Sequence, residues 1–153
     1  MKEFKIKYPH NKAREILKNI KAKFTEKTEQ EDFYLKSTNT GILRLKKEGN
    51  EIYLIHLTKE KEGFGINLSE RLDEEVTNSL LSFFKNNQLV IKKTREHYFW
   101  KGAKIVLDNV GGLGEFMEVY PQDEVTKEEL LKAFKINPTE LITESYYDMW
   151  KKK

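Results

Sequence analysis

The chain has 153 residues, an ordinary length for one domain with a substantial core. Its formal net charge is +3, an excess too small to predict a nucleic-acid or membrane partner. The absence of cysteine excludes disulfides, cysteine-ligated zinc and thiol nucleophiles. There is no signal-peptide pattern, and no run approaches the roughly 20 apolar residues of a membrane span, so we expect a single cytoplasmic domain over residues 1–153.

The first half of the chain predicts five strands and one helix. A strand is expected at residues 4–8, where apolar and charged side chains alternate with period two. After Pro9, Asn11 is expected to cap a helix, whose apolar positions are Ala13, Ile16, Leu17, Ile20 and Phe24. Four further strands are expected over residues 25–35, 42–47, 51–61 and 64–72.

The second half predicts three helices and three strands. One helix is expected to start at Asp73 or Asn78 and to end at Asn87. Strands are expected over residues 89–95, 97–110 and 115–120, and the pair Lys101-Gly102 offers a break within the second of them. Thr126 opens a capping-box pattern for another helix, and a short closing helix is expected to begin at Ser145.

Repeated charge on one face of several strands is the feature that points to function. Three basic pairs are spaced i, i+2, so each pair lies on one face of its strand: Lys5 and Lys7, Arg44 and Lys46, and Lys93 and Arg95. For any single strand, the ordinary explanation is that this face meets water. If the sheet closes into a barrel, however, these faces line its interior, and such an interior suits a polyphosphate.

Several segments resemble, in the correct order, the motifs of the CYTH or triphosphate-tunnel family. They are Gln30 to Leu35 (Q-x-D-x-Y-F), Leu43 to Lys46 (L-R-L-R), Leu57-Thr58 (L-T-x-K), Lys93 to Arg95 (K-x-R), Leu107 to Glu118 (L-D-x-V-x-x-L-G-x-F-x-E) and Ser145-Tyr146. That family includes class IV adenylyl cyclases, thiamine triphosphatases and inorganic tripolyphosphatases. The resemblance implies an α+β fold: a closed eight-stranded antiparallel β-barrel with helices packed outside, forming one CYTH-like domain.

The resemblance also implies a ligand, a metal and the residues that bind them. The ligand would be a triphosphate such as ATP, tripolyphosphate or thiamine triphosphate, bound by Lys7, Arg44, Lys46, Lys93 and Arg95. Mg²⁺ or Mn²⁺ would be bound by Glu3, Asp108 and Glu118. If the chain is active, it would be a metal-dependent triphosphatase or a class IV adenylyl cyclase.

The metal-binding signatures depart from the family pattern. The opening E-x-E-x-K reads Glu3-Phe4-Lys5-Ile6-Lys7, and the closing E-x-E reads Glu118-Val119-Tyr120. The middle R-x-E-x-E aligns with Ser69 to Asp73 and places Arg71 at an acidic position. We therefore expect weakened metal binding and reduced activity. The alternative is a non-catalytic module that binds or senses nucleotide or polyphosphate; single-stranded RNA fits the motif spacing poorly.

Overall fold

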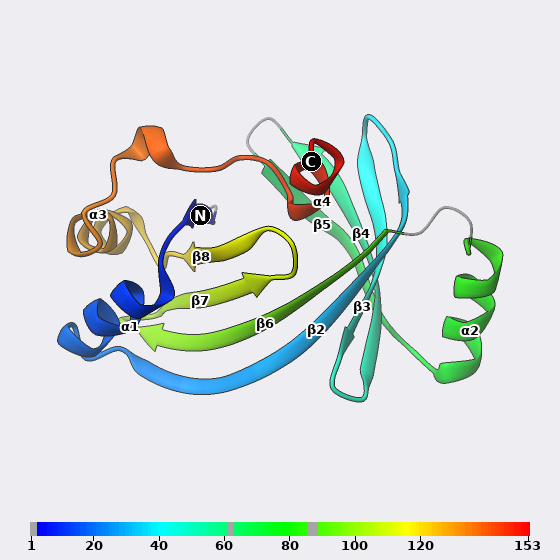
Figure 1. Cartoon of the computed structure of the whole chain (residues 1–153), viewed down its shortest axis with the longest axis horizontal. Helices are drawn as coiled ribbons and strands as arrows, with labels where there is room; N and C mark the ends of the chain where they lie inside the picture. The colour runs from blue at the N-terminus through cyan, green and yellow to red at the C-terminus, as the bar shows by residue number, and fades with distance from the viewer. Residues whose placement is uncertain (1–2, 61–62, 86–88) are drawn as a thin grey trace. The chain divides into compact units, whose positions relative to one another are not determined.

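The computed structural model describes residues 3–60, 63–85 and 89–153. Its elements in chain order are β1 (Phe4–Lys7), α1 (His10–Asn19), β2 (Lys23–Ser37), β3 (Gly41–Glu48), β4 (Glu51–Glu60), β5 (Gly63–Leu72), α2 (Glu74–Phe83), β6 (Leu89–Trp100), β7 (Ala103–Val110), β8 (Gly114–Tyr120), α3 (Glu124–Ala133), the 3₁₀ turn η1 (Pro138–Glu140) and α4 (Tyr146–Lys151) (Figure 1). Within the described part of the chain, no helix has the length and apolar character needed to cross a membrane.

The strands form one eight-stranded sheet in the order β1-β8-β7-β6-β2-β3-β4-β5. The pairs β1–β8, β7–β8, β2–β3, β3–β4 and β4–β5 are antiparallel. In this order β1 and β5 are the end strands, and among the described residues no pairing joins them. The prediction of eight antiparallel strands with additional helices is confirmed.

The chain divides into two compact units, and the boundaries fall inside β2, inside β6 and between η1 and α4. The first unit comprises the residues up to Thr28 together with Thr94–Thr143. The second comprises Glu29–Lys93 and Glu144–Lys153.

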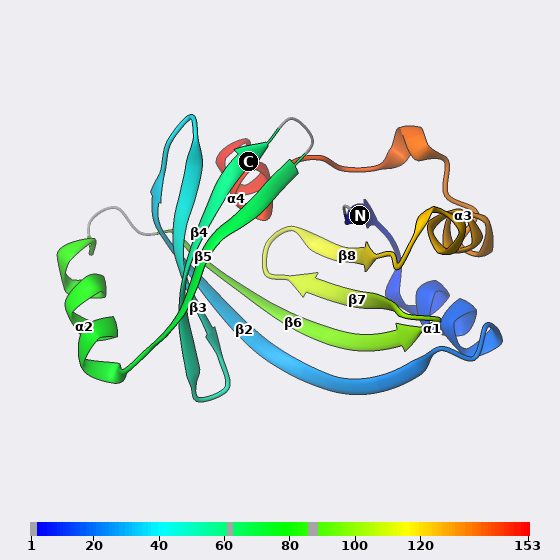
Figure 2. The same ribbon diagram turned by 180° about the vertical axis from the view of Figure 1, so that it is seen from behind.

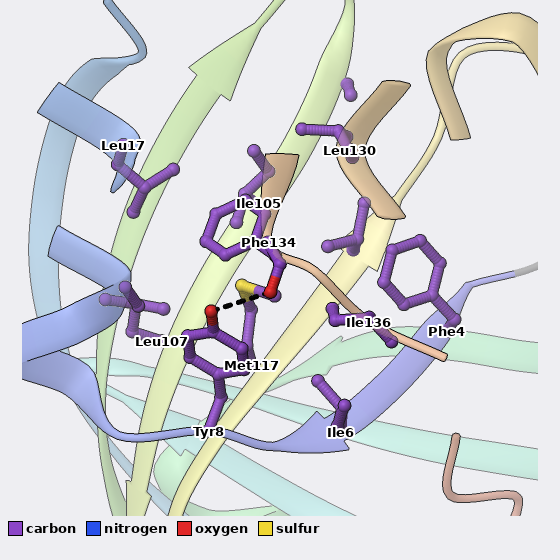
Figure 3. Packing of buried hydrophobic residues seen from close by; sticks show 13 residues of the cluster. Phe4, Ile6, Tyr8, Leu17, Ile105, Leu107, Met117, Leu130, Phe134 and Ile136 are labelled. Atoms are coloured by element: carbon purple, nitrogen blue, oxygen red, sulfur yellow. Dashed lines mark hydrogen bonds between the residues drawn. The ribbon is translucent and has the colours of Figure 1, made fainter. Parts of the chain in front are cut away.

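The first unit contains a continuous apolar core formed by strands β1, β7 and β8 with helices α1 and α3. Figure 3 shows its main members: Phe4, Ile6, Tyr8, Leu17, Ile105, Leu107, Met117, Leu130, Phe134 and Ile136. The Tyr8 hydroxyl donates a hydrogen bond to the carbonyl oxygen of Phe134 at 2.9 Å, and the two rings meet edge to face. This core holds β1 against the end of α3 and so fixes the position of the charged residues on β1.

The second unit contains the hairpins β3–β4 and β4–β5 and a smaller set of buried side chains, including Tyr34, Leu35, Ile42, Leu45, Ile55, Ile91 and Tyr146. Helix α2 is loosely packed in comparison. Thr77 is the buried residue within its span, and Val76 and Phe83 are exposed. Figures 1 and 2 both show α2 standing clear of the strands.

Helix boundaries differ from several of the sequence predictions. Helix α1 begins at His10 after Pro9, with no side-chain cap, so the predicted Asn11 cap is wrong. Phe24 lies in β2 rather than on that helix. Of the two predicted starts for α2, Asp73 is confirmed, because its carboxylate accepts a hydrogen bond from the Val76 amide.

Of the two later predicted helix starts, one is wrong and one is confirmed. Helix α3 is capped by Asp123, which accepts hydrogen bonds from both the amide and the hydroxyl of Thr126, so Thr126 does not open the helix. The predicted start of the closing helix at Ser145 is confirmed, because Ser145 caps α4. The predicted ends of α2 at Asn87 and of β4 at Lys61 fall outside the described residues.

The boundary between β6 and β7 is the main correction to the strands. Strand β6 continues through Glu96 to Trp100, and the chain reverses at Lys101-Gly102, where both φ angles are positive (46° and 78°). Two consecutive positive φ angles are typical of the type I′ hairpin turn. The predicted end of a strand at Arg95 is therefore wrong, and the predicted break at Lys101-Gly102 is confirmed.

Candidate functional site

Most of the charged residues singled out from the sequence lie in two clusters, one within each unit. In the first unit the acidic cluster consists of Glu3, Lys5, Arg95, Asp108, Glu118 and Tyr120. In the second unit the basic cluster consists of Asp32, Arg44, Lys46, Glu48 and Lys93. Apart from Glu3, which precedes β1, the members of both clusters lie on strands, so their geometry follows from strand register.

Register brings the acidic cluster together on one face of β1, β8 and β7. Lys5 of β1 lies directly opposite Glu118 of β8, which in turn lies opposite Val106 of β7. Asp108 follows Val106 by two residues, and Tyr120 follows Glu118 by two, so period-two alternation places all of these side chains on the same face.

Arg95 and Asp108 form a fully buried, two-pronged ion pair. The Arg95 Nε donates to Asp108 Oδ1 at 2.6 Å, and Nη2 donates to Oδ2 at 2.7 Å. Asp108 is 0% exposed and Arg95 is 7% exposed. Burial by itself would lower the pKa of Arg95, but the hydrogen bonds and charge of Asp108, together with Glu118, raise it well above its usual value. The guanidinium is therefore a fixed positive charge.

Glu118 is surrounded by three donors from the protein itself. The Tyr120 hydroxyl donates to Glu118 Oε2 at 2.9 Å, and Arg95 Nη2 lies 3.5 Å from the same oxygen. The Lys5 ammonium lies 3.7 Å from Oε1. Burial and the negative charge of Glu118 raise the pKa of Tyr120 well above its usual value, so Tyr120 remains a hydrogen-bond donor at neutral pH.

Glu3 completes the acidic cluster; the residue as a whole is exposed, but its carboxyl group is partly buried. This burial and the nearby charge of Glu118 raise the pKa of Glu3, and the neighbouring Tyr120 hydroxyl and the charges of Lys5 and Arg95 partly offset this rise. The cluster thus holds three carboxylates and two cations, which leaves one net negative charge.

Asp32 is the centre of the basic cluster, and the sequence reading did not assign it a role. It is 1% exposed, and its Oδ2 lies 3.2 Å from Lys93 Nζ and 3.6 Å from Arg44 Nη1. Burial alone would raise the pKa of Asp32, but the charges of Lys93, Arg44 and Lys46 outweigh it and lower the pKa. Asp32 therefore stays ionised and holds two cations in place.

Glu48 and Gln30 extend the same arrangement along β2 and β3. Lys46 Nζ lies 3.4 Å from Glu48 Oε2, and Gln30 Nε2 donates to that oxygen at 2.6 Å. The sequence carried a signal for the two acids, Asp32 and Glu48. Gln30 and Asp32 are two residues apart and so share a face of β2, and register places them opposite Glu48 and Lys46 of β3. Pairing the two predicted strands identifies both acids.

Aromatic rings border the basic cluster. Lys93 Nζ lies 5.3 Å from the centroid of the Tyr146 ring, and the Arg44 guanidinium lies 6.0 Å from that of Tyr34. Tyr34 contacts Tyr147 of α4, with the ring centroids 5.0 Å apart. The first turn of α4 therefore packs beside the cations, which limits their access to water.

Two other cations named from the sequence lie in more open positions. Lys7, on β1 of the first unit, is exposed, with its Nζ 5.8 Å from the centroid of the Phe116 ring. Arg71, on β5 of the second unit, has a side chain 67% exposed and lies 3.7 Å from Glu51. Register places Arg71 opposite Tyr53, which is itself opposite Lys46, so Arg71 projects from the same face of the sheet as Lys46.

The two clusters have different chemical capacities. The basic cluster offers an arginine fork and two ammonium groups, which match phosphate oxygens in charge and geometry. The acidic cluster offers carboxylates of the kind that bind Mg²⁺, although its own cations lie against them.

Comparison with known proteins identifies similar sequences and structures. The family model of the CYTH domain matches residues 1–150. A protein of Methanocaldococcus jannaschii that carries the name "Putative adenylate cyclase" is 26% identical to this chain, over 96% of both proteins.

Solved structures share the fold at low sequence identity. A protein of Pyrococcus horikoshii superposes with a TM-score of 0.79 at 20% identity, covering 95% of this chain and 96% of the other. An adenylyl cyclase homologue from Hippeastrum, reported to have a dominant triphosphatase activity, superposes with a TM-score of 0.68 at 14% identity, covering 98% and 94%.

Proposed function

Since this chain belongs to the CYTH domain family, we propose that it binds a triphosphate-bearing small molecule such as ATP, tripolyphosphate or thiamine triphosphate. The relatives support this class of ligand, because one carries the name of an adenylate cyclase and another is reported to have triphosphatase activity. Both activities act on a chain of three phosphates.

The observation that carries the proposal is the basic cluster around Asp32. Its three cations face two carboxylates, so one positive charge is in excess. Because Asp32 is buried and ionised, Lys93 and Arg44 are held in position before any ligand arrives. A phosphate chain would meet fixed donors, and little ordering of side chains would oppose its binding.

The full set of proposed phosphate ligands is Lys7, Arg44, Lys46, Lys93 and Arg95. Arg44, Lys46 and Lys93 belong to the second unit, whereas Lys7 and Arg95 belong to the first. Their action as a single site remains a prediction from the family resemblance. Arg95 is engaged with Asp108, so its proposed contact with phosphate would compete with that pair.

Titration calorimetry with tripolyphosphate, ATP and thiamine triphosphate tests the binding proposal. Arg44→Ala and Lys93→Ala should each weaken binding by about tenfold or more, because a charge-assisted hydrogen bond contributes roughly 1.5–3 kcal/mol. Lys47→Ala and Lys92→Ala are matched controls: each removes one positive charge from an exposed neighbour on the opposite face of the same strand. Equal losses in the variants and their controls would show that net charge alone governs binding, which would contradict the proposed site.

The proposed reaction is hydrolysis of the triphosphate or, for ATP, cyclisation with release of pyrophosphate. In either reaction the cations would neutralise negative charge on the phosphates. A metal ion, if Glu3, Asp108 and Glu118 held one as the family resemblance implies, would supply further positive charge there. Assays for released phosphate, pyrophosphate and cyclic AMP with Mg²⁺ or Mn²⁺ distinguish the two reactions. Turnover no greater than in buffer, across all three ligands, would contradict both.

A non-catalytic binding module is the second candidate. The contacts that Lys5 and Tyr120 make with Glu118 favour it, because they occupy a carboxylate that the family pattern assigns to the metal. This candidate predicts triphosphate binding without turnover, in the same calorimetric and product assays.

A further inference from the structure

Two of the three carboxylates that the family resemblance assigns to a metal, Asp108 and Glu118, are already paired within the protein. Both oxygens of Asp108 accept hydrogen bonds from Arg95, at 2.6 and 2.7 Å. Both oxygens of Glu118 lie near donors: Oε1 near Lys5, and Oε2 near Tyr120 and Arg95. The carboxylate oxygens that a metal ion would need as ligands are therefore already contacted by donor groups of the protein.

A divalent cation fits this arrangement poorly. Mg²⁺ needs oxygen ligands at about 2.0–2.1 Å in a near-octahedral shell. An ion bound to Asp108 would lie beside the Arg95 guanidinium, which does not deprotonate in proteins. With three carboxylates against two cations, only one net negative charge opposes the two positive charges of the ion.

Lys5 is held at this place by the backbone. The β1–β8 register sets it directly opposite Glu118, and its side chain is only 12% exposed. The carbonyl of Lys5 also accepts a hydrogen bond from the Ile142 amide at 2.8 Å, so β1 is anchored on a second side at the same residue. The ammonium group is thus positioned by paired backbone and is not carried on a mobile segment.

Tyr120 reinforces the same carboxylate from the other side. It follows Glu118 by two residues on β8, so both side chains share a face and the phenol reaches Oε2. In the family pattern, positions 5 and 120 both carry glutamate, which would give five carboxylates against the single cation Arg95, or four net negative charges. The two residues that depart from the family pattern, Lys5 and Tyr120, therefore both contact one carboxylate, that of Glu118.

We propose that the Lys5 ammonium is the resident counter-cation of the acidic cluster, in the place that the family resemblance gives to a divalent metal. Arg95 and Lys5 neutralise the carboxylates, Tyr120 fixes Glu118, and the cluster takes up no Mg²⁺ or Mn²⁺. A corollary, which rests on the proposed function, is that the triphosphate is bound without a divalent cation.

Direct binding of Mn²⁺ alone, followed by electron paramagnetic resonance, tests the first statement independently of any triphosphate. Each protein is compared with the same protein carrying Glu118→Gln, and the Mn²⁺ binding lost on that change is the Glu118-dependent binding. The wild-type protein should show no Glu118-dependent binding, and the double variant Lys5→Glu with Tyr120→Glu should show it. Glu118-dependent binding of Mn²⁺ by the wild-type protein would overturn the proposal, as would its absence from a folded double variant.

A milder variant covers the case in which the double variant does not fold. Lys5→Gln removes the ammonium but keeps a side chain of similar length, and it leaves Tyr120 in place. It should show Glu118-dependent Mn²⁺ binding that is weaker than in the double variant but measurable above wild type. If Lys5→Gln binds no more Mn²⁺ at this place than the wild-type protein does, Lys5 is not what excludes the ion, and the proposal is wrong.

Calorimetry with tripolyphosphate in EDTA and in excess Mg²⁺ tests the corollary. The expected dissociation constant in EDTA is equal to or lower than that in Mg²⁺. Tightening by about tenfold or more in Mg²⁺ would contradict metal-independent binding. If tripolyphosphate does not bind under either condition, the proposed function fails, whereas the Mn²⁺ result still decides the role of Lys5.

Discussion

Asp108→Asn should strongly destabilise the protein, because it removes the charge that pairs directly with the buried Arg95 guanidinium. The substitution keeps the shape of the side chain, but it removes the charge and one of the two acceptors that face Arg95. Both residues are nearly inaccessible to water, so solvent cannot replace the lost contact. Removing one partner of such a pair typically costs about 3–5 kcal/mol. At about 2–4 °C per kcal/mol for a chain of this size, the melting temperature should fall by roughly 6–20 °C.

Thermal and urea unfolding followed by circular dichroism measure this loss, with Glu129→Gln as the matched control. Glu129 pairs with Lys101 at 3.1 Å in the same unit, but its side chain is 44% exposed and that of Lys101 is 62% exposed. Exposed pairs contribute roughly 0–1 kcal/mol, so the control should be nearly neutral. If Asp108→Asn lowers the free energy of unfolding by no more than Glu129→Gln, the Arg95–Asp108 pair does not have the buried geometry described here.

Three further predictions concern other charged groups and one turn. The cationic neighbours of Asp32 lower its pKa, so the stability that its charge contributes is present above the unfolded-state pKa of about 3.9 and is lost as the pH falls through the lower folded-state pKa. Urea unfolding in acid should therefore show a smaller loss of stability for Asp32→Asn than for the wild-type protein. Glu96→Gln should lower the free energy of unfolding by about 1 kcal/mol in urea, because it weakens the two hydrogen bonds from Arg14 at 3.0 and 2.6 Å. Arg14→Ala should produce a loss of the same size if this pair is responsible. Gly102→Ala should cost about 1–2 kcal/mol in the same assay, because alanine is strained at a φ of 78°, and a neutral result would show that the β6–β7 turn adapts.

Local structure could be read from the sequence where a single strand or helix carried its own signal. Period-two alternation located β1 and β8, and it identified the faces that carry Lys5 and Glu118. Helix starts at Asp73 and Ser145 were also predicted, and in the structure each of these residues caps its helix by accepting a hydrogen bond from the next turn. The predicted starts at Asn11 and Thr126 failed: both are capping residue types, but α1 begins directly after Pro9 and α3 is capped by Asp123.

The pairing of charges was decided by tertiary structure. Lys93 and Arg95 are two residues apart on β6 and looked equivalent in the sequence, yet Lys93 pairs with Asp32 of β2 and Arg95 with Asp108 of β7. Alternation along β6 says that the two cations share a face, but it does not identify the strand that neighbours each of them. The carboxylate that each cation contacts depends on sheet order and register, which involve residues as far as 61 positions away.

The sequence by itself therefore determined the strand faces, the family and the substitution of Lys5 and Tyr120 for carboxylates, because each of these is a property of a short segment or of motif order. The tertiary structure determined that both substitutions act on Glu118. Lys5 and Glu118 are 113 positions apart, and only the β1–β8 register places the ammonium opposite that carboxylate, 3.7 Å from Oε1.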